Sequence, residues 1–177
     1  MNETKHEQEP ESLRRTGVLN CEELEDCPGV PAEERLRKGP VAVIECQEEI
    51  PCNPCEGNCP RGAIHVGHAV TSRPRLDIDK CVGCALCISR CPGLAIFVVD
   101  LSQEDGDRVC VPYEFLPLPR NGDTVRAVDR SGSDVCDAEV LSVNRDARSD
   151  RTAVITLRVP KGLGMAVRFF RVIEKEA

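Results

Sequence analysis

With 177 residues and twelve cysteines, the chain is long enough for one sizeable domain or two small ones and has far more cysteine than average. Aromatic residues make up only 3% and tryptophan is absent, so a conventional core can bury little surface and something else must organise the cysteine-rich part. The net charge of −7 argues against nucleic acid as a main partner, and we expect no membrane span because no run of about 18 apolar residues occurs.

The N-terminus is polar and lacks the apolar segment of a secretory signal. We therefore expect a cytoplasmic location. In such a reducing compartment, clustered cysteines usually bind metal rather than form disulfides.

Two short helices are predicted near the N-terminus. Residues 1–16 lack periodicity and are expected to form a mobile tail, followed by a helical arm over 17–40. Within this arm, Asn20 precedes Glu23 by three residues, which is a capping-box pattern and predicts the start of the first helix. Pro31, taken as a first helical position, predicts the start of the second.

Short strands are predicted from residue 41 onward. The apolar run VAVIEC (41–46) indicates a buried strand, and three more candidates lie at 63–66, 75–79 and 95–99. Beyond residue 101, apolar and polar residues alternate between turn signals, which predicts strands at 108–111, 124–129, 135–143, 152–159 and 167–173. We expect these last five to form a separate small β-barrel or sandwich domain over 101–177, after a cysteine-rich domain over 41–100.

A cysteine motif occurs twice in that domain, with the copies 32 residues apart. The second copy, KCVGCALCISRCP, has the spacing C-x2-C-x2-C-x3-C-P, in which three cysteines bind one [4Fe–4S] cube and the fourth binds the other. We therefore expect two [4Fe–4S] clusters that exchange their last ligands. The first cluster would be held by Cys46, Cys52, Cys55 and Cys91, and the second cluster by Cys81, Cys84, Cys87 and Cys59. A zinc site, the alternative, would leave the third cysteine and the repeat unexplained.

Residues 41–100 resemble a bacterial-type dicluster ferredoxin domain, most clearly in LDIDKCVGCALCISRCPGLAI (76–96). The resemblance implies an α+β fold in which two pseudo-symmetric β-hairpins and two short helices surround the clusters. In that fold, 41–46 would pair with 95–99, and 63–66 with 75–79.

The first loop departs from this family at its first cysteine. Glu49 stands at the matching position, and Cys46 lies three residues earlier. Glu49 as a ligand, a three-iron cluster and an empty site are the alternatives. We favour Cys46, because thiolate is the commoner ligand of iron–sulfur clusters.

The first loop also contains Pro51 and Pro54 where the second has Gly83 and Leu86. Each proline removes an N–H donor beside the sulfurs. Since hydrogen bonds to sulfur favour the reduced cluster, we expect the first cluster to have the lower reduction potential.

The remaining cysteines and the histidines are not needed as ligands of the two clusters. Cys21, Cys27, Cys110 and Cys136 are expected to be small, half-buried side chains, with a third cluster as the alternative. His65 and His68 flank the first hairpin and are interpreted as surface or turn residues.

The function predicted from these features is electron transfer. Residues 15–55 are similar to small ferredoxin-like subunits of FAD-containing amine or amino-acid dehydrogenases of the proline and hydroxyproline type. That similarity implies a hetero-oligomer with FAD-containing subunits. The N-terminal arm and the C-terminal β-domain, which are additions to the ferredoxin core, are expected to serve for docking, and we expect this chain to be no enzyme on its own. No nucleotide-binding glycine pattern or nucleophile–base pair is present. The alternatives are a redox-sensing or structural iron–sulfur module and a free ferredoxin-type carrier.

Overall fold

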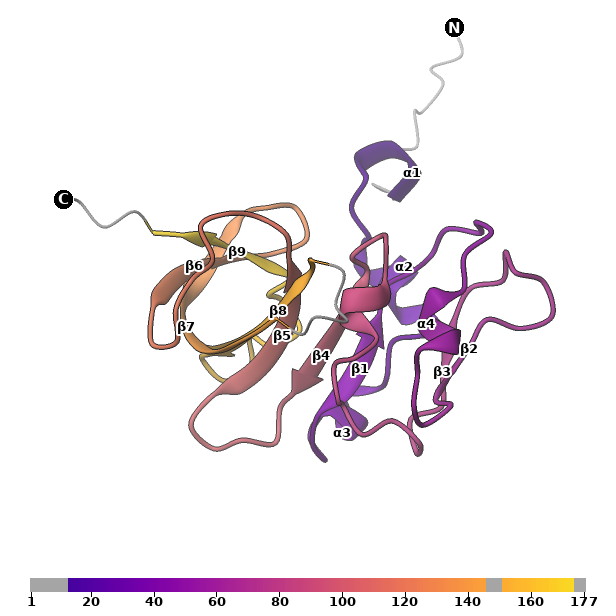
Figure 1. The fold of residues 1–177 in the computed structure, drawn as a ribbon, viewed down its shortest axis with the longest axis horizontal. Coiled ribbons are helices and arrows are strands. Elements are labelled where there is room, and N and C mark those ends of the chain that lie inside the picture. The colour runs from indigo at the N-terminus through magenta and orange to yellow at the C-terminus, as the bar shows by residue number, and fades with distance from the viewer. Residues whose placement is uncertain (1–12, 146–150, 174–177) are drawn as a thin grey trace, which may run out of the picture.

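The structure is a computed structural model that describes residues 13–145 and 151–173. Its helices are short and lie in the N-terminal half, as Figure 1 shows. They are α1 (Leu13–Thr16), α2 (Cys21–Glu25), α3 (Glu33–Leu36), α4 (Pro54–Gly57) and the 3-10 helix η1 (Ile88–Arg90). Within the described residues, no helix has the length and apolar character needed to cross a membrane.

The predicted start of the first helix is confirmed. The Asn20 side chain accepts a hydrogen bond from the Glu23 N–H at 2.8 Å, and the Glu23 carboxylate accepts one from the Asn20 N–H at 3.1 Å, which completes a capping box for α2. The second helix exists, but it begins at Glu33 rather than Pro31, because Ala32 is extended and acts as the N-cap.

The expected N-terminal tail is only partly described. Residues 13–16 form α1, contrary to the expectation of an unstructured segment, and the Leu13 N–H donates to the Glu23 carboxylate at 3.0 Å. Residues 1–12 lie outside the described part of the chain.

Nine strands are described, and each overlaps a range predicted from the sequence. They are β1 (Val41–Ile44), β2 (Ile64–His65), β3 (Arg75–Leu76), β4 (Ile96–Asp100), β5 (Asp107–Tyr113), β6 (Thr124–Val128), β7 (Asp134–Asn144), β8 (Ala153–Val159) and β9 (Phe169–Val172). β1 pairs antiparallel with β4, and β2 with β3, which are the two pairings implied by the ferredoxin resemblance.

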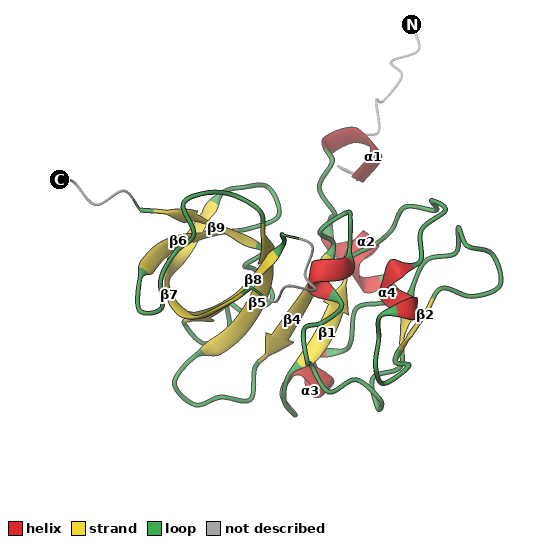
Figure 2. Cartoon of the chain, in the orientation of Figure 1, coloured by secondary structure: helices red, strands yellow, loops and turns green. Residues whose placement is uncertain are grey.

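The expected separate barrel or sandwich is not what the structure shows. One open, seven-stranded antiparallel sheet has the order β1-β4-β5-β8-β7-β6-β9, so it continues across the proposed boundary at residue 100. The connection is direct, because β5 pairs with β4 on one edge, with Val99 opposite Val109, and with β8 on the other. The strands after β5 curve strongly but do not close, as Figure 2 shows. Independent folding of 101–177 stays a prediction.

The sheet buries apolar side chains on both faces. In β1, Val41 and Val43 pack into the core enclosed by the curved C-terminal strands, whereas Ala42 and Ile44 pack against the cysteine-bearing loops. All four residues are at most 1% exposed. This explains why β1 is continuously apolar, and it places the cysteines against the second face of the sheet.

Candidate iron–sulfur centres

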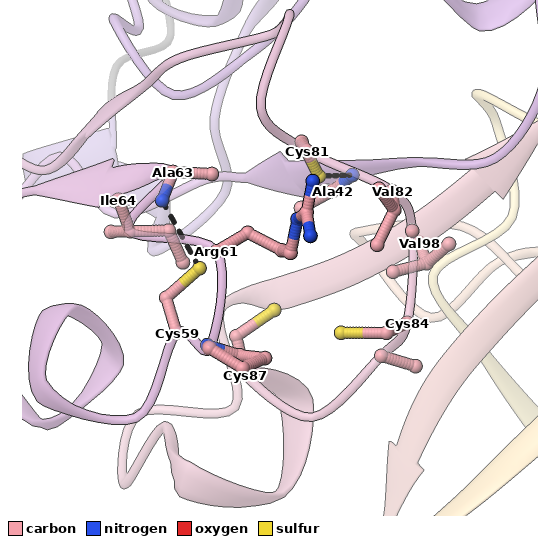
Figure 3. A pocket seen from close by; sticks show the side chains of 13 residues that line it. Ala42, Cys59, Arg61, Ala63, Ile64, Cys81, Val82, Cys84, Cys87 and Val98 are labelled. Atoms are coloured by element: carbon pink, nitrogen blue, oxygen red, sulfur yellow. Dashed lines mark hydrogen bonds between the residues drawn. The ribbon is translucent and has the colours of Figure 1, made fainter.

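Four cysteine side chains line one small cavity. Cys59 comes from the loop after α4, and Cys81, Cys84 and Cys87 come from the loop between β3 and η1, as seen in Figure 3. The structure therefore brings together the four residues predicted for the second cluster.

A second small cavity is lined by the other four predicted cysteines, Cys46, Cys52, Cys55 and Cys91. Cys46 reaches it because it follows β1 directly. Glu49 is exposed and does not line this cavity, although Glu48 does. Of the two ligand candidates considered for the first cluster, the geometry thus favours Cys46.

Backbone N–H groups point at sulfur atoms in both cavities. The Ala63 N–H donates to Cys59 Sγ at 3.2 Å, and the Ala95 N–H donates to Cys91 Sγ at 3.4 Å, so the 32-residue repeat also repeats this contact. The second-cluster cysteine Cys81 accepts a hydrogen bond from Ala42 of β1 at 3.4 Å. Such donors stabilise negative charge on the sulfurs.

Close backbone approach shapes the second loop. Gly83 has φ +64° and lies against Pro40, where an added Cβ would meet the proline Cβ at 2.5 Å. Ala85 has φ 62°, also left-handed, and the two residues together turn the chain so that Cys81, Cys84 and Cys87 face one cavity.

The thiols interact electrostatically within each set of four. Burial, with smaller contributions from the neighbouring Cys81, Cys84 and Cys59, raises the pKa of the Cys87 thiol to about 12. Burial likewise raises the pKa of Cys46 to about 11, with contributions from the other three cysteines of its cavity. Thiolates in such places need positive charge nearby, which bound iron supplies.

The type and number of the donors fit iron–sulfur clusters. Thiolates are soft ligands that select iron–sulfur clusters, copper(I) or zinc. Among the described residues, no group of three or more His, Cys, Asp or Glu side chains is arranged to hold a metal ion. The sulfurs instead line two cavities with four cysteines each, which matches the number of ligands that a [4Fe–4S] cube needs.

The other cysteines and the histidines stay away from the cavities. The buried Cys27 thiol donates to the Ile44 carbonyl at 3.2 Å, while Cys110 on β5 lies beside Thr156. Cys21 is exposed and Cys136 lies half-buried on β7, so these four form no site of their own in the described part of the chain. His65 and His68 are exposed, as expected.

Two charged residues at the cavities were not predicted from the sequence. Arg61 lines the second-cluster cavity and Glu48 lines the first-cluster cavity. Their closeness to the cysteines in the sequence could have indicated them, because Arg61 lies two residues after Cys59 and Glu48 two residues after Cys46.

Comparison with known proteins gives matches to ferredoxin-type proteins. Residues 50–95 match the family model described as "4Fe-4S dicluster domain". A ferredoxin-type protein of Haemophilus influenzae, NapF, is 36% identical over 58 residues, covering 32% of this chain and 33% of that protein. An uncharacterised ferredoxin of Methanocaldococcus jannaschii is 31% identical over 75 residues, covering 41% and 45%. No solved structure matches.

These matches concern part of the chain. The chain spans between a third and a half of the length of these curated relatives. The family match and the ferredoxin relatives agree with the cysteine geometry. Residues 50–95 thus match a 4Fe-4S dicluster domain, and the chain is similar over part of its length to ferredoxin-type proteins.

Proposed function

We propose that this chain is the electron-transfer iron–sulfur subunit of a larger flavin-containing oxidoreductase and relays single electrons through two [4Fe–4S] clusters. The observation that carries the proposal is the pair of cavities, each lined by four cysteines of both loops. Cysteines of both sets pack in a single apolar cluster with residues such as Ile64, Ile88 and Val98. This packing supports two clusters placed close enough for electron exchange.

The proposed ligands follow from the cavity walls. Cys46, Cys52, Cys55 and Cys91 would hold the first cluster, and Cys81, Cys84, Cys87 and Cys59 the second. When bound, such clusters supply one-electron redox steps. The chain contributes thiolates, N–H donors to sulfur and apolar side chains that exclude water from the cavity walls.

The proposed partners are FAD-containing dehydrogenase subunits of the amine or amino-acid type, in a hetero-oligomer. A flavin supplies the junction between two-electron substrate oxidation and one-electron transfer, so this chain alone would turn over no organic substrate. Phe115 and Leu116 are 61% and 83% exposed, and such apolar surface suits contact with another protein. A cytoplasmic location belongs to the same proposal, since a reducing compartment keeps thiols available as ligands.

The test is to purify the chain from its native source together with whatever remains bound, then identify flavin and partner chains. The expected preparation is brown, contains about eight iron atoms per copy of this chain and bleaches reversibly with dithionite. Dehydrogenase activity from this chain without a flavoprotein would refute the subunit assignment. Loss of iron during one cycle of reduction and oxidation would favour the redox-sensing alternative.

A further inference from the structure

The two cysteine cavities carry opposite charges on their walls. Arg61 lines the second-cluster cavity, and its side chain extends between Cys59 and Cys81, as Figure 3 shows. Glu48 lines the first-cluster cavity. The two sites therefore differ in charge although each has four cysteines.

The internal repeat shows that the two loops carry different residues at the positions of Arg61 and Glu48. A shift of 32 residues places Arg61 on Gly93 and Glu48 on Lys80. The first loop thus contributes a cation to the second-cluster cavity, and the second loop offers only glycine at the matching position. At the other position, Glu48 on the wall of the first-cluster cavity corresponds to Lys80, which pairs with Asp77 and does not line the second-cluster cavity.

We infer that Arg61 and Glu48 set the order of the two reduction potentials, with the second cluster the easier to reduce. The inference rests on the proposed function, since it requires both clusters. Reduction adds one negative charge, which is favoured by a nearby cation and disfavoured by a nearby anion. Neither residue is a proposed ligand, so each acts on the potential through the cavity wall.

Other charges near the first loop do not line either cavity. Glu45 forms ion pairs with Arg130 and Arg168, and none of these three residues is a wall residue of the cysteine cavities. The charges on the cavity walls, Arg61 and Glu48, are therefore the difference that acts most directly on the two reduction potentials.

The order of potentials gives electron flow a direction. Electrons that enter at the first cluster would pass downhill to the second. There Cys84 is exposed between Val82 and Leu86, which are 52% and 43% exposed. We accordingly assign the second cluster as the site from which an acceptor takes electrons.

The test is an EPR-monitored redox titration of the full chain with both clusters. Arg61→Gln should shift the electron-sharing equilibrium between the clusters about two- to fivefold toward the first cluster, the range expected for exposed charges. Glu48→Gln should shift that equilibrium in the same direction by a similar factor, by easing reduction of the first cluster. Arg61→Lys, which keeps the charge, should have an electron-sharing equilibrium close to that of the unaltered protein.

Matched control substitutions make the same change in net charge at positions away from the cavities. Arg120→Gln and Glu104→Gln alter exposed residues that line neither cavity and should leave the equilibrium unchanged. Signals are assigned with Cys46→Ser, which removes a proposed first-cluster ligand. Equal effects of Arg61→Gln and Arg120→Gln, with both EPR signals intact, would overturn the inference. Absence of two EPR-active clusters in the unaltered protein would instead overturn the proposed function on which it rests.

Discussion

A buried ion-pair network beside the first cysteine loop provides a test of how the chain is held together. Glu45 follows β1, and its carboxylate accepts hydrogen bonds from Arg130 at 2.6 Å and from Arg168 at 2.7 Å. The side chains of Glu45 and Arg168 are only 6% and 4% exposed, and the Arg168 guanidinium lies 5.0 Å from the centre of the Phe97 ring. The network therefore joins the edge strand before Cys46 to the C-terminal strands.

Glu45→Gln should destabilise the fold by about 3–5 kcal/mol, the usual cost of breaking a buried ion pair, because the two guanidinium groups remain without their carboxylate. Burial already lowers the pKa of Arg168 to about 10 despite the opposing effect of Glu45, which shows that this cation is poorly solvated. With a urea dependence of about 2 kcal/mol per molar, the unfolding midpoint should fall by about 1.5–2.5 M.

The measurement is urea unfolding of the cluster-loaded protein, followed by far-UV circular dichroism. Glu33→Gln is the matched control, because Glu33 pairs with Arg37 on an exposed helix surface and both side chains are more than 60% exposed. Its cost should be about 0.5 kcal/mol or less. Equal midpoints for Glu45→Gln and Glu33→Gln would refute the reasoning.

Three further predictions concern the cluster loops. Cys59→Ser should change the EPR signal of the second cluster; a change confined to the first cluster would show that the ligands are not exchanged. Cys46→Ser should convert the first cluster to a three-iron form or abolish it, whereas Glu49→Gln should leave it intact; two complete cubes in Cys46→Ser would restore Glu49 as the ligand. Gly83→Ala should lower second-cluster occupancy at least severalfold in iron and sulfide analysis, because the new Cβ would meet Pro40 at 2.5 Å; full occupancy would show that the loop adapts.

Local patterns in the sequence predicted much of the fold. The capping box at Asn20 and Glu23 formed as expected, since it depends on contacts within one helical turn. Strand positions were also predicted well, because alternation records which side chains face a core. The start of α3 was displaced from Pro31 because proline permits either an extended or a helical backbone, and neighbouring contacts decide between them.

The sequence by itself determined which cysteines gather, since their short spacing within each loop limits where the thiols can point, and the structure brings the two predicted sets of four together. Only the tertiary structure decided that β5 joins β4 in a continuous sheet, because any exposed strand edge can pair with any other of suitable length. The tertiary structure also placed Arg61 on the wall of the second-cluster cavity and Glu48 on the wall of the first-cluster cavity. Side-chain direction at exposed loop positions carries no periodic signal, so those charges become visible only in the folded chain.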